Sequence, residues 1–383
     1  MRTSYRWVIP TAVTATITAG ALVVPQLASA DPELEPTTAA ELLVDLATAP
    51  DQPFSGTVVQ STDLGLPELP TGPGDSGDLT TLLAGRTMMR VWSDGPERSR
   101  IAVMGSLSET DVVRDGRDLW LWESEGNTAT HVTLPEADET AAEAAEAQAA
   151  REQMMAGNPQ MFAEQALAAI DPTTAVSIDG AASVAGRDAY ELVLEPRDDA
   201  SLIGSVRIAV DAATSLPLRV QVTARGATEP AYETGFTKVS FDTPGDEVFQ
   251  FAPPAGAEVT EQSLEGMDAG QNARTQDAGA AHAGAVHADV MPTVLGEGWT
   301  TVVVLEGVDA AQVGEAAGGD GIAEALLGGF QPVSGDFGSG RMLTTSLVSA
   351  LWLDDGRLLV GAVTPAELEA AAVAAVPLPV PVP

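Results

Sequence analysis

Apolar and polar residues alternate in five short segments between residues 86 and 134, a pattern typical of β-strands that bury one face. Turn-forming residues separate the segments, among them Asp115-Gly116, which supplies the positive φ that a tight hairpin needs. The pattern therefore predicts an antiparallel meander. Its predicted strands are Thr87–Trp92, Ser99–Val103, Thr110–Arg114, Asp118–Trp122 and Thr128–Leu134.

One of these segments, Leu119-Trp120-Leu121-Trp122, carries large apolar side chains on both of its faces. A strand of this kind needs cover on both sides of its sheet. We expect the rest of the chain to supply that cover incompletely and to leave an apolar cavity that a lipid can occupy.

Further alternating segments on either side of the meander predict that the sheet continues. The predicted strands are Gly56–Asp63, Thr174–Ile178, Ala181–Val184, Arg187–Glu195, Gly204–Asp211, Pro217–Thr223 and Thr234–Asp242, with Phe249-Gln250-Phe251 closing the sheet. Helical patterns interrupt them. A capping box at Thr38 and Glu41 starts a helix that ends at Ala47, a second begins at Thr140 and runs to Met155, and a third covers Gln160–Ile170.

Residues 261–289 are rich in Gly, Ala, Gln and Asp and predict a flexible linker between a first domain, 31–260, and a small α+β domain, 290–376. In the second domain we expect a strand at Gly298–Glu306, a weak helix at Ala316–Leu327, a hairpin of Arg341–Trp352 with Arg357–Ala362, and a last helix capped by Thr364. A Pro-rich tail follows at 377–383.

Charge and cysteine content exclude several classes of function. The 383 residues include 18 Lys and Arg against 55 Asp and Glu, a net charge of −37, which repels nucleic acid. The acid excess fits a solvated surface or an acidic face for a basic partner. The chain has no cysteine, so disulfides, thiolate chemistry and lipid attachment at an N-terminal cysteine are excluded.

The first 30 residues resemble a secretory signal. Arg2 and Arg6 precede an apolar run from Val8 to Val24, and Ala28-Ser29-Ala30 offers the small residues that a signal peptidase reads. We expect cleavage after Ala30 and an extracytoplasmic location, secreted or in the cell envelope and peripheral to the membrane. The alternative is that the run stays as an N-terminal membrane anchor.

Catalytic chemistry has few candidates in the sequence. His131 lies in a predicted strand, and His282 and His287 lie in the linker, so no nucleophile triad or zinc site is easily assembled. We expect no enzymatic activity, metal or cofactor. Among enzymes, an acid hydrolase that uses a carboxylate pair is the remaining hypothesis.

Five stretches, in their order along the chain, resemble the bacterial lipoprotein-carrier (LolA-like) fold: Phe54–Gln60, Asp115–Trp120, Val184–Leu192, Ile208–Leu218 and Phe236–Phe241. With a second domain in which a hairpin leads from Gly340 to Pro365, the chain looks most like the two-domain MucB/RseB sensor proteins. The resemblance implies a curved antiparallel half-barrel, mainly β with α, whose apolar concave face is partly plugged by helices. It carries no catalytic residues.

The resemblance implies two functions. In the first, the protein carries or sequesters the acyl chains of a lipid or lipoprotein. The residues expected to line the cavity are Met88, Trp120, Trp122, Met161, Phe162 and Leu167. In the second, it senses envelope stress and regulates an anti-sigma factor, or another membrane protein, through its C-terminal domain.

Overall fold

The computed structural model describes residues 34–65, 84–105, 108–134, 158–168, 170–263, 293–307 and 328–375. The predicted signal at 1–30, the helices at 140–155 and 316–327, the linker from 264 to 289 and the tail at 377–383 lie outside these ranges.

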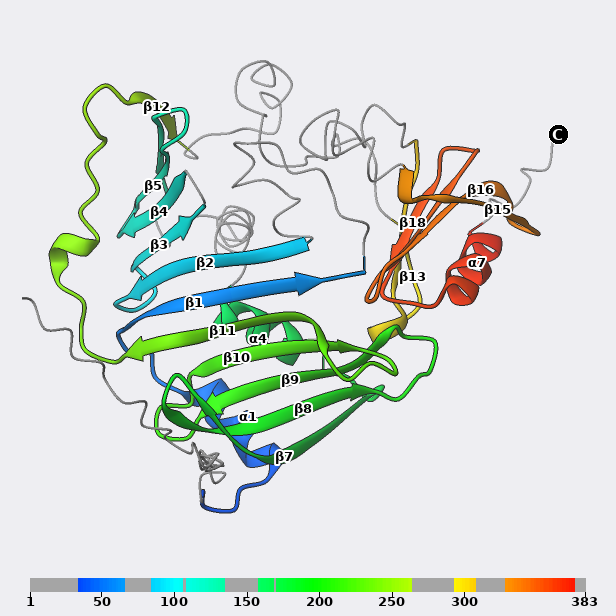
Figure 1. The fold of residues 1–383 in the computed structure, drawn as a ribbon, viewed down its shortest axis with the longest axis horizontal. Coiled ribbons are helices and arrows are strands. Elements are labelled where there is room, and N and C mark those ends of the chain that lie inside the picture. The colour runs from blue at the N-terminus through cyan, green and yellow to red at the C-terminus, as the bar shows by residue number, and fades with distance from the viewer. Residues whose placement is uncertain are drawn as a thin grey trace, which may run out of the picture. The chain divides into compact units, whose positions relative to one another are not determined.

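A large sheet of twelve strands dominates the described chain (Figure 1). Its order is β12-β6-β5-β4-β3-β2-β1-β11-β10-β9-β8-β7, so the sheet is open and is not closed into a barrel. The fold is therefore mainly β, as predicted. The strands are β1 (Phe54–Asp63), β2 (Ala84–Ser93), β3 (Arg98–Met104), β4 (Glu109–Asp115), β5 (Asp118–Glu123), β6 (Thr128–Thr133), β7 (Thr174–Val184), β8 (Arg187–Pro196), β9 (Ile203–Asp211), β10 (Pro217–Ala224), β11 (Pro230–Ser240) and β12 (Glu258–Ser263).

The predicted meander is confirmed as β2 to β6, each strand antiparallel to the next. Its turns have the expected chemistry, with Gly116 at φ 63° after β4. The β7–β8 hairpin turns at Ala185-Gly186, where both residues have positive φ, as a type I′ turn requires. Thr174–Ile178 and Ala181–Val184, predicted as two strands, form the single strand β7 with a bulge near Gly180.

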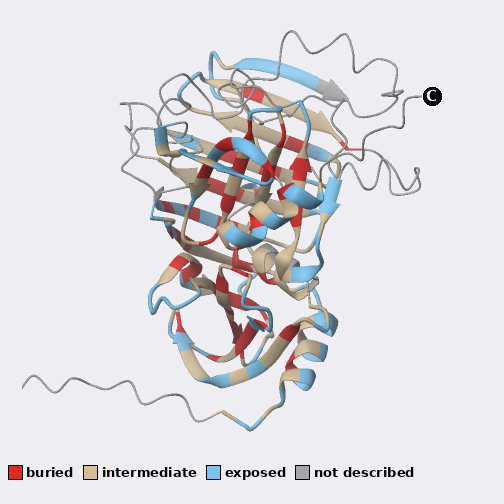
Figure 2. Cartoon of the chain, turned by 90° about the vertical axis from the view of Figure 1, so that its right-hand side faces the viewer, coloured by how far each residue is buried: buried red, intermediate tan, exposed pale blue. Residues whose placement is uncertain are grey.

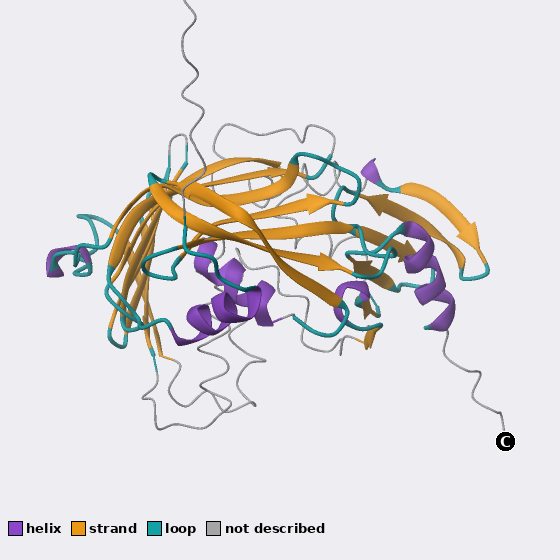
Figure 3. Cartoon of the chain, turned by 90° about the horizontal axis from the view of Figure 1, so that it is seen from below, coloured by secondary structure: helices purple, strands orange, loops and turns teal. Residues whose placement is uncertain are grey.

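Two helices pack against one face of the large sheet (Figure 3). Helix α1 (Ala39–Thr48) begins with the predicted capping box, in which Thr38 Oγ1 accepts from the backbone N–H of Glu41. Helix α4 (Pro159–Ala168) contacts β10 and β11. We call the face that these helices contact the inner face and the opposite one the outer face. Buried apolar residues of the two helices and of β8 to β11 form one core cluster (Figure 2).

The edge of the sheet next to β6 differs from the prediction. Phe249 and Phe251 do not form a strand; they follow a 3₁₀ turn, Asp246–Val248, and pack on the outer face, where Arg98 lies over the Phe249 ring. The edge strand is instead β12, which runs parallel to β6 and includes residues assigned to the linker. A parallel pairing across more than a hundred residues leaves no turn signal in the sequence.

The C-terminal residues form a second sheet of six strands, in the order β13-β14-β18-β17-β16-β15. The predicted strand at Gly298–Glu306 is shorter, because Gly298–Thr300 is a 3₁₀ turn. Helix α7 (Pro365–Ala374) is capped by Thr364, as predicted. The strands are β13 (Thr293–Leu295), β14 (Val302–Leu305), β15 (Gln331–Gly335), β16 (Gly338–Thr344), β17 (Ser349–Leu353) and β18 (Leu358–Gly361).

Specific contacts join this second sheet to the large one, and residues 32–383 form a single unit by their contacts. Leu347 is buried in the core cluster of the large sheet. The backbone N–H of Leu202 donates to the carbonyl of Ala362, and Trp299 Nε1 donates to Thr174 Oγ1 over 2.8 Å.

Candidate functional site

A continuous row of paired residues crosses the inner face of the large sheet. Cα pairing places Thr87, Gln60 and Thr234 side by side, and the row continues on the same face through apolar residues. One half of the row is thus polar and the other half is apolar. The apolar members are Val220, Ile208, Leu192 and Ile178.

Helix α4 covers the apolar half of this row. Its Phe162 and Leu167 pack against the core cluster that contains Val220 and Ile208, and the Phe162 ring lies 4.7 Å from the ring of Tyr232 on β11. Both residues therefore fill the inner face beside β10 and β11.

The polar half is buried although its side chains are hydrophilic. Gln60 and Thr87 of this half, and Thr62 on the next paired row of the same face, are all at least nine-tenths buried. Within the described residues the hydroxyls of Thr62 and Thr87 have no hydrogen-bond partner. Burying a hydroxyl without a partner is unfavourable by roughly 1–3 kcal/mol. Burial also raises the pKa of Tyr232, which pairs with Thr62, so its hydroxyl stays protonated despite the opposing effect of Thr234.

Apolar side chains continue on the inner face beyond the polar row. Met89 pairs with Val58, Val91 pairs with Ile101, and all four are buried in a second core cluster that includes Phe236. No residue of a described helix belongs to that cluster. The inner face therefore offers two apolar regions on either side of a buried polar row.

The structure does not bring the six predicted lining residues together. Phe162 and Leu167 lie on the inner face, whereas Met88, Trp120 and Trp122 lie on the outer face, because each pairs in register with outer-face neighbours. Trp120 stacks on His131 at 4.2 Å and contacts Phe251, and Met88 is 46% exposed. The Met161 side chain lies outside the described residues.

The outer-face residue His131 lies between two carboxylates, which suits a structural role. Its Nδ1 is 2.6 Å from Glu261 of β12, and its Nε2 is 2.8 Å from Asp118 of β5. Partial burial alone would lower the pKa of His131, but both hydrogen bonds and both charges raise it above the ordinary value.

We expect the protonated ring to hold β12 against β6. A raised pKa means that this contribution is present below the unfolded-state pKa and is lost as the pH rises through the folded-state pKa. The measurement is an NMR titration of the His131 ring. Glu261→Gln should lower its pKa, whereas Glu258→Gln, on the same strand, should leave it unchanged. Equal titrations in both variants would contradict this role for Glu261.

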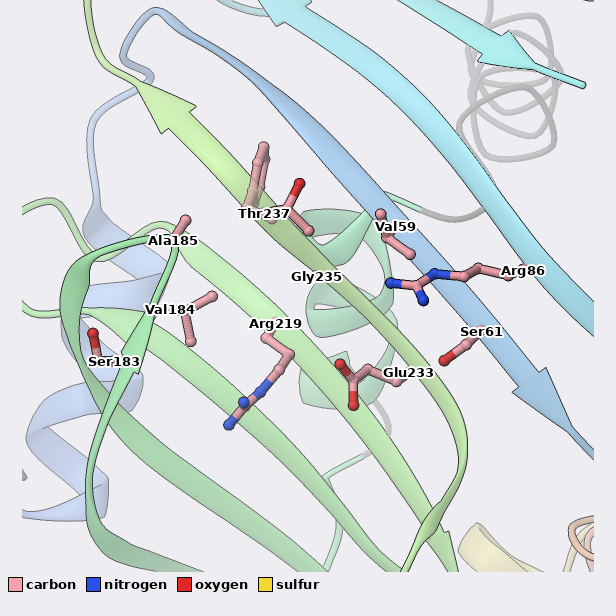
Figure 4. A pocket seen from close by; sticks show the side chains of 11 residues that line it. Val59, Ser61, Arg86, Ser183, Val184, Ala185, Arg219, Glu233, Gly235 and Thr237 are labelled. Carbon is pink, nitrogen blue, oxygen red and sulfur yellow. The ribbon is translucent and has the colours of Figure 1, made fainter. Parts of the chain in front are cut away.

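A pocket of about 230 Å³ lies on the outer face, between β1, β11 and the β7–β8 hairpin (Figure 4). Its charged lining residues are Arg86, Arg219 and Glu233. Arg219 donates to Glu191 over 2.8 Å, and Glu233 accepts from Gln221 over 2.7 Å. The rest of its lining includes the apolar residues Val59, Val184 and Phe236, of which Val184 and Phe236 belong to the second core cluster.

Residues 80–261 match a family model described as "predicted periplasmic protein" (DUF2092). A comparison with curated proteins gives no match. Among solved structures, a MucA/MucB complex from Pseudomonas aeruginosa matches at 16% identity, 88% coverage of this chain, 96% coverage of that chain and a TM-score of 0.42. A LolA-superfamily protein from Nitrosomonas europaea matches at 13% identity, with 56% and 99% coverage and a TM-score of 0.23.

A lipoprotein-sorting protein domain from Vibrio parahaemolyticus also matches, at 10% identity, 55% and 95% coverage and a TM-score of 0.22. The predicted resemblance is confirmed in that proteins of both kinds, MucB and LolA-like, are among the similar structures. Because the identities and TM-scores are low, these structures assign no role to any individual residue of this chain. In the part of the chain that the structure describes, no helix is both long and apolar enough to cross a membrane.

Proposed function

We propose that this chain is an extracytoplasmic, non-enzymatic binding protein that holds the acyl part of a lipid or lipoprotein on the inner face of its large sheet. One observation carries the proposal: a row of buried, partly unpartnered polar side chains lies between two apolar regions on that face. A ligand with a polar linkage and apolar chains matches such a surface. The match to a family of predicted periplasmic proteins supports the location.

The apolar regions are suited to acyl chains. Burial of an acyl chain contributes roughly 0.8 kcal/mol for each methylene, so a chain of about twelve carbons gains on the order of 10 kcal/mol before other terms. Loss of translational freedom and side-chain ordering offset much of this gain. Net affinity is therefore moderate, which allows a carrier both to keep a lipid out of water and to release it.

The polar row is suited to an ester, amide or carboxyl group. The hydroxyls of Thr62 and Thr87 can each donate a hydrogen bond, and the neutral Tyr232 hydroxyl lies on the next paired row. In the unliganded protein, a buried hydroxyl without a partner is a cost. A ligand carbonyl that accepts from it would remove this cost and gain affinity.

Replacing Thr62 and Thr87 with valine should separate binding from stability. Valine keeps the shape and removes the unpartnered hydroxyls, so the free energy of unfolding of the ligand-free protein should stay the same or rise by about 1 kcal/mol. Affinity for an acyl ester should fall about tenfold, the equivalent of roughly 1.4 kcal/mol. The measurements are native mass spectrometry with a diacylglycerol lipid and urea unfolding.

Thr133→Val is the matched control, because Thr133 lies on the outer face of the same sheet, paired with Asp118. It should bind the ester normally. A wild-type protein that takes up no acyl lipid, from its own envelope or when lipid is added, would overturn the proposal. If the valine variants bound the ester with unchanged affinity, the polar row would not be part of the binding site.

A second candidate function is regulation of an anti-sigma factor by the C-terminal sheet. The observation in its favour is the edge strand β15, which is exposed along most of its length at Gln331–Gly335. An exposed edge can pair with a strand of another protein. Co-elution of the full chain with the extracytoplasmic domain of a candidate anti-sigma factor, lost when β15 is shortened, would favour this function.

A further inference from the structure

Three cations without carboxylate partners gather on the outer face of the large sheet. Arg86 and Arg90 lie on β2, and Lys238 lies on β11; Thr57 of β1 pairs with both Arg90 and Lys238, so these two flank it on one face. All three side chains are exposed. Within the described residues, none of them makes an ion pair or a side-chain hydrogen bond. We call Arg86, Met88, Arg90 and Lys238 the basic strip.

The basic strip stands out because seven of the described arginines are paired with carboxylates. Its net charge is −37, and Lys238 is its single lysine. Only two other described arginines, Arg197 and Arg341, are exposed without a partner, and neither lies in the large sheet beside the strip. The arginines paired with carboxylates are Arg98, Arg100, Arg187, Arg207, Arg219, Arg225 and Arg357.

Met88 gives the strip an apolar element. It lies between Arg86 and Arg90 on the outer face and is 46% exposed. Few other large apolar side chains of the described residues are as exposed. The positions facing it on β1 are Val59 and the small hydroxyl residues Thr57 and Ser61. An exposed apolar side chain flanked by cations is the arrangement of an interfacial membrane contact, in which the apolar group enters the headgroup region and the cations bind phosphates.

We infer that the basic strip docks the protein on an anionic lipid surface. The overall negative charge does not prevent this, because at physiological salt the screening length is about 8 Å and carboxylates on remote faces are screened. Cations in contact with headgroups are not screened in this way, and each contributes roughly fivefold to binding. The three cations together should contribute on the order of 100-fold, which gives a reversible contact.

The outer-face pocket adjoins one end of the strip, since Arg86 belongs to both (Figure 4). Beside Arg86, Ser61 adds an exposed hydroxyl, while Glu233 lies across it on β11 and is bound by Gln221. The Arg86 end can therefore receive a single headgroup phosphate, and the Arg90 and Lys238 end faces the lipid surface. This docking is independent of the acyl site, because it uses the opposite face of the sheet.

The test is co-sedimentation of the purified chain with vesicles of equimolar phosphatidylglycerol and phosphatidylcholine. Reversing both charges in R90E/K238E should weaken binding at least 25-fold. The control R197E/R341E changes the net charge by the same amount at exposed arginines elsewhere, and it should bind as the wild type does. Comparing variants cancels any contribution of the N-terminal apolar run. Vesicles of phosphatidylcholine alone should bind all three proteins equally weakly.

Equal losses in R90E/K238E and in the control would overturn the proposal, because net charge alone would then explain them. Displacement of the protein from vesicles by polyglutamate at constant ionic strength would overturn it in favour of an acidic macromolecule. Uptake of acyl lipid, measured by native mass spectrometry, should be the same in all variants. Loss of uptake in every protein, with docking retained, would count against the proposed function and leave this inference standing.

Discussion

Asp211→Ala should destabilise the large sheet by about 3 kcal/mol in urea unfolding at neutral pH. The Asp211 side chain is 0% exposed at the end of β9 and accepts from Arg187 Nη2 over 2.8 Å. It also accepts from the backbone N–H groups of Ala213 and Thr214 and from the Thr214 hydroxyl. Removing one partner of a buried ion pair typically costs about 3–5 kcal/mol. The lower end applies because Arg187 is 32% exposed and can be rehydrated.

The pH dependence of this loss follows from the pKa of Asp211. Burial alone would raise that pKa, but hydrogen bonds from Arg187 and Thr214 and the charge of Arg187 hold it below the ordinary value. For a lowered pKa, the stabilisation is present above the unfolded pKa, about 4, and is lost as the pH falls through the folded pKa. The difference in the free energy of unfolding between the wild type and the variant should therefore become smaller at acid pH.

Asp199→Ala is the matched control for this prediction. Asp199 pairs with Arg225, but its side chain is 97% exposed, and exposed pairs contribute about 0–1 kcal/mol. The free energy of unfolding of this variant should stay within roughly 0.5 kcal/mol of the wild-type value. If Asp211→Ala lowered the free energy of unfolding as little as Asp199→Ala does, the Arg187–Asp211 pair would not stabilise the β9–β10 turn.

Local signals made most of the large sheet predictable. Alternation and turn residues gave the meander, and the capping residues Thr38 and Thr364 marked the starts of two helices. Strand β12 was not predicted, because its partner β6 lies more than a hundred residues away and the pairing is parallel. In the second sheet, β13 and β15 were not predicted, because their three and five residues are too short for a periodic signal. Arg341–Trp352, predicted as one arm of a hairpin, instead contributes to two antiparallel strands, β16 and β17.

The candidate site was predictable only in part, and the reason is the two-residue period of a strand. Apolar side chains on both faces of β5 show that both are covered, but not which face points toward the helices. Phe251, from a segment far along the chain, covers Trp120 and Trp122 on the outer face. Phe162, an apolar position of the helical spacing, lies in the core cluster on the inner face, as the apolar stripe of a surface helix does.

The buried polar row had no signal that a single sequence could reveal. In Thr57-Val58-Val59-Gln60-Ser61-Thr62, hydrophilic residues stand at both parities, so alternation cannot tell that Gln60 and Thr62 are buried. Only the register of β1 against β2 and β11 places them on the inner face beside Thr87 and Thr234.

Truncating the chain before residue 293 should destabilise the remaining large sheet by on the order of 5 kcal/mol. The truncation uncovers the core cluster where Leu347 is buried, a contact that contributes about 2 kcal/mol. It also removes hydrogen bonds that contribute about 1 kcal/mol each. The bonds lost are Leu202 N to Ala362 O, Thr364 N to Ala200 O, Ser346 N to Leu64 O, and Trp299 Nε1 to Thr174 Oγ1.

The measurement is urea unfolding followed by the fluorescence of Trp92, Trp120 and Trp122, which all remain in the truncated chain. In the full chain, Leu347→Ala should reproduce about 2–4 kcal/mol of the loss, since it leaves a cavity in the same cluster. An unchanged midpoint in both proteins would mean that the two sheets are energetically independent. Where the truncated chain is folded, it should still take up acyl lipid, because the polar row and the apolar strand residues beside it lie within 34–263.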